Sequence, residues 1–136
     1  MRGTATVALP APGLLLRHRP PALLLASVEA HTGRALTCTG IDAGSWPWPR
    51  LLEGTAQAAG LLAGLQPGGP GNGAVIAEYR DVVLGVARHR GRVRFEARLE
   101  RRLARFWRCR CEARAADGRV LLASRVTLAP GQDGSR

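Results

Sequence analysis

The clearest pattern along this chain is the strict alternation of apolar and charged residues in its C-terminal half. Apolar side chains take every second position in residues 92–100 and again in residues 105–115. A period of two predicts strands of an antiparallel sheet that buries one face and exposes the other to water. The apolar positions are Val93, Phe95, Ala97 and Leu99 in the first run, and Trp107, Cys109, Cys111 and Ala113 in the second.

A different pattern occupies residues 50–65, where nearly every side chain is small or aliphatic. An apolar surface all round predicts a buried α-helix. Each glycine in it lowers helix propensity by roughly 1 kcal/mol relative to alanine, which favours a helix gripped closely by neighbouring elements. A buried carboxylate is costly unless it is paired or used in chemistry. Glu53 is therefore either structurally paired or part of a working site, and Gln57 lies one turn further along the same face.

The remaining segments complete a plan of one hairpin, one helix and several long strands. Two short runs of β type at 22–30 and 34–41 flank a turn and predict the hairpin. Proline and glycine make residues 42–49 and 66–73 predicted loops. The other expected elements are a strand over 74–79 that continues through 82–86, a turn at 88–91, and a last strand over 119–128 after the Asp117-Gly118 hairpin turn.

A sheet with one apolar face and a single apolar helix is most simply arranged by wrapping the sheet round the helix. The pattern therefore predicts an α+β class and one domain over residues 1–136, with a core at about 16–128 and irregular ends. The edge strand needs a cover or a second copy beside it, and residues 74–86 are the segment expected to pair.

The charge balance favours an acidic partner. The chain carries 20 basic residues against 10 acidic ones, a net charge of +10, and every basic residue is Arg. No helix-turn-helix or other nucleic-acid signature accompanies this charge, so nucleic acid is not an expected partner. Three cysteines without framework spacing fit a reducing compartment. No run reaches the length of a membrane span and no signal peptide is recognised, so a cytoplasmic location and no membrane are expected.

Four segments, in the same order, give the chain a family resemblance. They are His18-Arg-Pro-Pro-Ala-Leu-Leu-Leu25, Leu51-Leu-Glu-Gly-Thr-Ala-Gln-Ala-Ala-Gly60, the strand beginning Gly91-Arg-Val-Arg-Phe-Glu-Ala97, and the stretch from Phe106-Trp-Arg to Ala116-Asp-Gly-Arg-Val-Leu-Leu-Ala-Ser124. Together they resemble the hotdog-fold 3-hydroxyacyl-acyl-carrier-protein dehydratases over about residues 16–128. The resemblance implies a hotdog fold, a dimer, and a substrate carried on the phosphopantetheine arm of a carrier protein, with no other cofactor.

The resemblance also implies roles for two residues and exposes one departure. The family's helix carboxylate falls on Glu53 and its helix amide on Gln57. In the family, a His on a short His-Phe-Pro-Gly loop before the helix removes the proton α to the thioester carbonyl, and the carboxyl group protonates the departing hydroxyl. Here Trp46-Pro-Trp-Pro49 occupies that place, and the usual catalytic His is missing.

Several other residues are candidates for the site. Asp42 and Ser45 lie in the altered loop, where a general base or a polarising contact would be useful. Trp46 and Trp48 either plug the mouth of a pocket or line an acyl channel. The histidines His18, His31 and His89 are weaker candidates for the missing base. Cys109 and Cys111 share a strand face, but two thiols fall short of the usual four zinc ligands, so no metal site is expected.

Three functions remain open from the sequence. The chain either dehydrates 3-hydroxyacyl thioesters of acyl carrier protein in fatty-acid or polyketide-type biosynthesis, with degraded activity, or is a non-catalytic dehydratase-like subunit that pairs with an active homologue. A hotdog acyl thioesterase, in which a helix carboxylate activates water, is the third. The arginines of the alternating strands are either a solvated sheet face or a docking surface for the carrier, in a homodimer or heterodimer.

Overall fold

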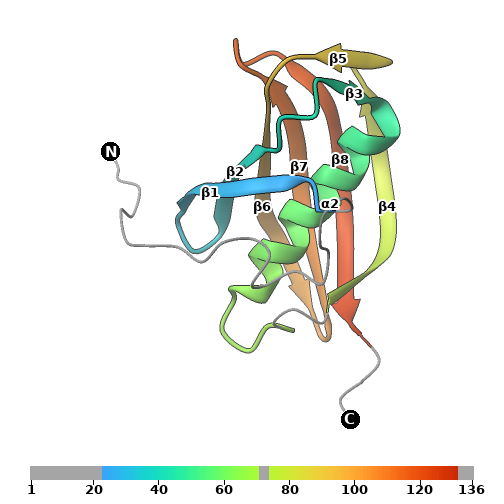
Figure 1. Cartoon of the computed structure of the whole chain (residues 1–136). Coiled ribbons are helices and arrows are strands. Elements are labelled where there is room, and N and C mark those ends of the chain that lie inside the picture. The colour runs from blue at the N-terminus through green and yellow to red at the C-terminus, as the bar shows by residue number, and fades with distance from the viewer. Residues whose placement is uncertain (1–22, 71–73, 132–136) are drawn as a thin grey trace.

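The computed structural model describes residues 23–70 and 74–131, which form one helix and two antiparallel sheets (Figure 1). The large sheet has six strands in the order β1-β2-β6-β7-β8-β4, and the small one pairs β3 with β5. The strands are β1 Leu25–His31, β2 Ala35–Gly40, β3 Ser45–Pro47, β4 Ala74–Leu84, β5 Arg88–Arg90, β6 Val93–Leu103, β7 Phe106–Ala115 and β8 Val120–Pro130. This arrangement confirms the predicted α+β class, with one helix packed against an antiparallel sheet.

The helix α2 runs from Trp48 to Gly64 and lies across one face of the large sheet (Figure 1). It begins two residues earlier than predicted, because Pro49 sits in the first turn, where its missing N–H leaves no helical hydrogen bond unmade. Eleven of its residues are buried, in agreement with the predicted burial on several sides. Gly54 permits this close packing, since a Cβ there would lie 2.3 Å from Cζ of Phe95 on β6.

The strands follow the alternating pattern closely. The eight apolar positions named for the two runs are all buried, and they face α2 from β6 and β7. The first hairpin forms as predicted, with Gly33 at φ +84 in its turn. The second turn also forms, where Gly118 takes φ +90 and the Asp117 carboxylate accepts a hydrogen bond from the Arg119 N–H at 3.0 Å.

Two segments differ from the sequence prediction. Residues 45–47 were expected in a loop and residues 88–90 in a turn, but they pair as β3 and β5, with Trp46 opposite His89. A two-stranded ribbon leaves each strand one open edge, so Pro47 is tolerated there, as proline is at any strand edge. The interruption expected at Arg80-Asp81 is a β-bulge inside one continuous strand, in which Asp81 takes φ +54.

Three cysteines on the strands, Cys38, Cys109 and Cys111, belong to the buried core. Burial raises the pKa of the Cys38 and Cys109 thiols from 9.0 to about 12, and it also raises the pKa of Cys111 well above 9.0. The thiolate is the reactive form, so these thiols stay inert near neutral pH. All three are reduced.

We therefore expect a thiol reagent such as Ellman's to leave the native protein unlabelled at pH 8 over the first minutes. The three thiols should react at once in guanidinium chloride. Between pH 9 and about 12 the folded state keeps protons that the unfolded state releases, so the free energy of unfolding should fall as pH rises. Rapid labelling of a cysteine in the native protein would contradict this account.

Candidate functional site

The carboxylate and amide singled out in the sequence contact one another on α2. Glu53 and Gln57 lie one helical turn apart, and Gln57 Nε2 donates to Glu53 Oε2 at 3.3 Å. Gln57 Oε1 accepts a hydrogen bond from the Leu24 backbone N–H at 2.8 Å, just before β1. Only 1% of Gln57 is exposed. The chain before β1 therefore fixes the amide, and the amide turns its N–H groups toward the half-buried carboxylate of Glu53.

Tyr79 of β4 approaches the same carboxylate from the sheet. Its register partner is Val126, a buried residue of β8, so its ring lies on the α2 side of the sheet. Burial, with the negative charge of Glu53 next in importance and then Cys111, raises the Tyr79 pKa to about 12. The phenol is thus neutral near pH 7 and available as a hydrogen-bond donor. Its exposed fraction is 36%, so the group is within reach of a ligand.

The side of the site formed by β4 is apolar and open. β4 is the outermost strand on this side of the large sheet, beyond β8 (Figure 1). Its large apolar side chains remain exposed, up to 63% for Val83. They are Val75, Ile76, Tyr79, Val82, Val83 and Leu84. An exposed apolar surface of this extent on an edge strand is typical of an interaction site.

The two tryptophans are placed differently from one another. Trp46 has no exposed surface; its ring packs edge-on against Phe95 with 5.4 Å between centroids, so it belongs to the core and not to a pocket mouth. Gly40 makes room for it, since a Cβ there would lie 3.0 Å from Trp46 Cζ2. Trp48, at the start of α2, is 40% exposed.

Asp42 and Ser45 lie on the segment that leads into α2. Ser45 Oγ accepts a hydrogen bond from Arg88 Nη1 at 2.7 Å, which ties β3 to β5. Asp42 is exposed and follows Ile41, whose N–H donates to the Leu24 carbonyl at 2.9 Å. Asp42 thus directly follows a residue that is hydrogen-bonded to Leu24, whose N–H holds Gln57.

Two of the histidine candidates lie on strands. His89 is on β5 opposite Trp46, and His31 is the half-buried last residue of β1. His18 lies outside the described residues, as do the first part of its motif and the end of the 66–73 loop. Tyr79 was missed from the sequence, although it is the one tyrosine of the chain. The bulged register of β4 decides which side of the sheet the Tyr79 ring lies on, and the alternation of residues alone does not reveal that register.

Two searches found no match. No family model matches the sequence, and no curated protein does. In the described segments, no helix has the length and hydrophobicity to cross a bilayer, and no cluster of His, Cys, Asp and Glu is arranged to hold a metal ion.

Solved structures resemble the chain clearly. The dehydratase heterocomplex ApeI:P from Xenorhabdus doucetiae matches with a TM-score of 0.78 and 17% identity, over 93% of this chain and 94% of that one. A thioesterase from Haemophilus influenzae matches at 0.64 and 12%, over 81% and 82%. A hypothetical thioesterase with coenzyme A from Streptococcus pneumoniae matches at 0.61 and 13%, over 79% and 88%. At these identities the likeness establishes the fold, and the fold is the hotdog.

Proposed function

We propose that this chain is a dehydratase-like hotdog protein that binds 3-hydroxyacyl thioesters carried by acyl carrier protein, with weak or lost turnover. The observation that carries the proposal is the Glu53–Gln57 pair on the buried helix. An amide held by the Leu24 N–H and turned onto a half-buried carboxylate is a positioned group, as acid–base chemistry requires. The hotdog likeness to a dehydratase heterocomplex agrees with this choice of chemistry.

Dehydration of a 3-hydroxyacyl thioester removes the proton α to the carbonyl and expels the 3-hydroxyl group as water. In our proposal Glu53 protonates the departing hydroxyl, and Gln57 holds the carboxyl group in place. Neutral Tyr79 donates a hydrogen bond to the substrate. We assign no described residue to the removal of the α proton. In this chain Trp46, a buried core residue, lies in the segment where the family carries its catalytic His.

The partner half of the proposal rests on β4. Its exposed apolar edge suits another hotdog chain, either a second copy or a homologous dehydratase with a complete set of catalytic groups. In that arrangement the chain contributes structure and substrate binding, while the partner supplies the turnover. An acyl tunnel beside Glu53 is also part of this proposal.

The test is to incubate the protein with a 3-hydroxyacyl-carrier and to follow enoyl-carrier formation by mass spectrometry. We expect little or no enoyl product from the wild-type chain alone, because a positioned acid or base contributes about 10²–10⁴-fold and one is lacking. Carrier binding should persist and weaken with salt. Glu53→Gln should remove any residual turnover, and Tyr79→Phe should reduce it.

Glu29→Gln is the matched control, since it makes the same chemical change at an exposed position of β1. Turnover that equals a complete dehydratase and disappears in Glu53→Gln would show that another residue supplies the base; Asp42, Ser45, His18 and His89 would be changed next. Release of free acid with a bare carrier thiol would instead establish a thioesterase. Failure to bind any acyl-carrier would overturn the proposal.

A further inference from the structure

The face of the sheet that points away from α2 carries a transverse row of arginines. Strand register places Arg98 of β6 opposite Arg110 of β7, Arg110 opposite Arg125 of β8, and Arg125 opposite Arg80 of β4. Neighbouring strands lie about 4.8 Å apart, so like charges follow one another across four strands. Like charges directly opposite one another destabilise a sheet. The row of arginines therefore lowers the stability of the folded sheet.

Carboxylates relieve only part of this row. The ion pairs of the face are Arg125 with Glu100 at 2.9 Å and Asp81 at 2.6 Å, Arg80 with Glu78 at 3.5 Å, Arg108 with Glu78 at 4.0 Å, and Arg114 with Glu96 at 3.3 Å and with Glu112. In these ion pairs the carboxylates around the row are bound to arginines other than Arg98 and Arg110. Within residues 23–70 and 74–131, neither Arg98 nor Arg110 forms an ion pair.

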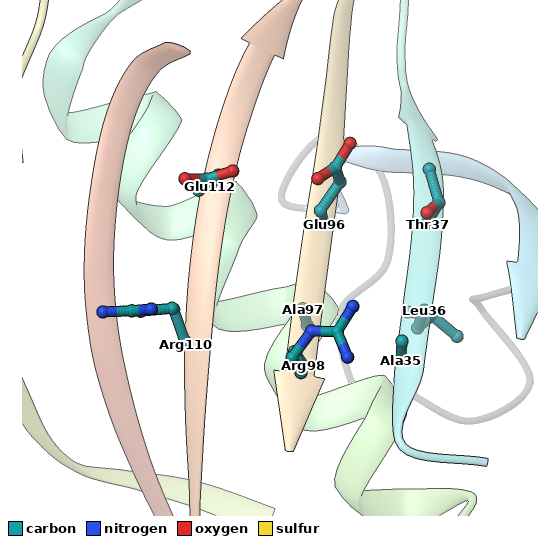
Figure 2. Close-up of a pocket in the computed structure, with 8 residues that line it drawn as sticks. All are labelled: Ala35, Leu36, Thr37, Glu96, Ala97, Arg98, Arg110 and Glu112. Carbon is teal, nitrogen blue, oxygen red and sulfur yellow. The ribbon is translucent and has the colours of Figure 1, made fainter. Parts of the chain in front are cut away.

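A hollow of about 160 Å³ lies over the Arg98–Arg110 pair (Figure 2). Thr37 of β2 borders it on one side, and Glu96 and Glu112 border it from the next row, where both are bonded to Arg114. Figure 2 shows the two guanidinium groups turned apart, that of Arg98 toward β2 and that of Arg110 away from it. This is the arrangement expected of two like charges with no anion between them.

We propose that the Arg98–Arg110 pair is a binding site for the phosphate group of a small molecule. The planar guanidinium fork matches phosphate oxygens, and a phosphate dianion offsets two positive charges where one carboxylate offsets one. Thr37 supplies a neutral donor at the β2 side. The site lies on the face of the sheet opposite Glu53, so it does not depend on the acyl chemistry proposed above.

The test measures phosphate binding to the full chain by NMR of the arginine Nε–H groups, at constant ionic strength maintained with chloride. Inorganic phosphate should shift the Arg98 and Arg110 signals in a saturable way. Arg110→Gln should bind about tenfold more weakly or worse, as the loss of one charge-assisted pair implies. Arg119→Gln removes the same charge at the β7–β8 turn and should leave the affinity within about twofold of wild type.

A second measurement separates this role from a structural one. In low-salt chloride, Arg110→Gln should melt at or above the wild-type temperature, because it removes a positive charge from between Arg98 and Arg125. A lower melting temperature with unchanged phosphate affinity would overturn the proposal, and so would the lack of saturable binding in wild type. Tighter binding of adenosine monophosphate than of inorganic phosphate would assign the site to a nucleotide; equal affinities would assign it to free phosphate.

Discussion

Gly54→Val is expected to destabilise the protein by about 3 kcal/mol, since forcing extra methyl groups into a packed core costs 1–3 kcal/mol and occasionally more. The first added carbon alone would lie 2.3 Å from Cζ and 2.4 Å from Cε1 of Phe95. That ring has no exposed surface and is held by Trp46 on one side, so it has little room to retreat. The melting temperature should fall by roughly 10 °C for a chain of this length.

Gly54→Ala makes a sharper comparison, because two effects oppose one another. Alanine gains roughly 1 kcal/mol in helix propensity, yet its Cβ meets the same ring. We expect a net loss of about 1 kcal/mol, measured by urea unfolding followed by circular dichroism. Adding Phe95→Leu should recover part of it, with a coupling energy of about 1 kcal/mol in the double-mutant cycle. A Gly54→Ala chain as stable as wild type would show that the ring can move aside.

Two lysines on β4, Ile76→Lys with Val83→Lys, are expected to weaken self-association by about 100-fold or more, or about 2.7 kcal/mol. Both side chains are exposed within one chain, so the fold itself should change little, whereas an interface would have to bury two ammonium groups. Sedimentation equilibrium at micromolar concentration measures the change. Leu103→Lys is the control, because it alters an apolar side chain of similar exposure at the end of β6.

The outcome for the wild-type chain also has a clear meaning. A monomer at micromolar concentration would exclude self-pairing through β4, and mixing with an active hotdog dehydratase would then test the heterodimer. A wild-type dimer that survives both lysines would place the interface elsewhere on the molecule.

The sequence predicted the elements whose signal is local and failed where the signal depends on partners. Alternation in β6 and β7 is a backbone property with a period of two, so the buried positions followed directly. The Glu53–Gln57 contact also followed, because helix geometry alone brings these residues together. The bulge at Asp81 was visible only as a polar interruption, and the β3–β5 ribbon has no periodic signal over three residues.

The site was harder to predict because its other members come from distant parts of the chain. The Leu24 N–H bonds Gln57 from 33 residues away in the chain, and Tyr79 faces α2 through the bulged register of β4, which a single sequence does not specify. Trp46 was misplaced for a related reason. Residues 45–47 were interpreted as loop, with Trp46 at a pocket mouth or along an acyl channel, but its ring packs in the core beside Phe95, where Gly40 leaves room for it.

The strand order of the sheet also determines when each strand can pair during synthesis. β4 precedes β5, β6 and β7 along the chain, yet its neighbour in the described sheet is β8, the last strand to be synthesised. The hairpins β1–β2 and β6–β7 can close from local contacts. β4 can pair only after β8 has been made, because Ala74 at its start lies opposite Pro130. At about 5–20 residues per second, translation leaves this apolar strand without a neighbour for several seconds. Aggregation during expression should therefore originate at β4, and a partner chain synthesised first would shorten the time during which both of its edges are open.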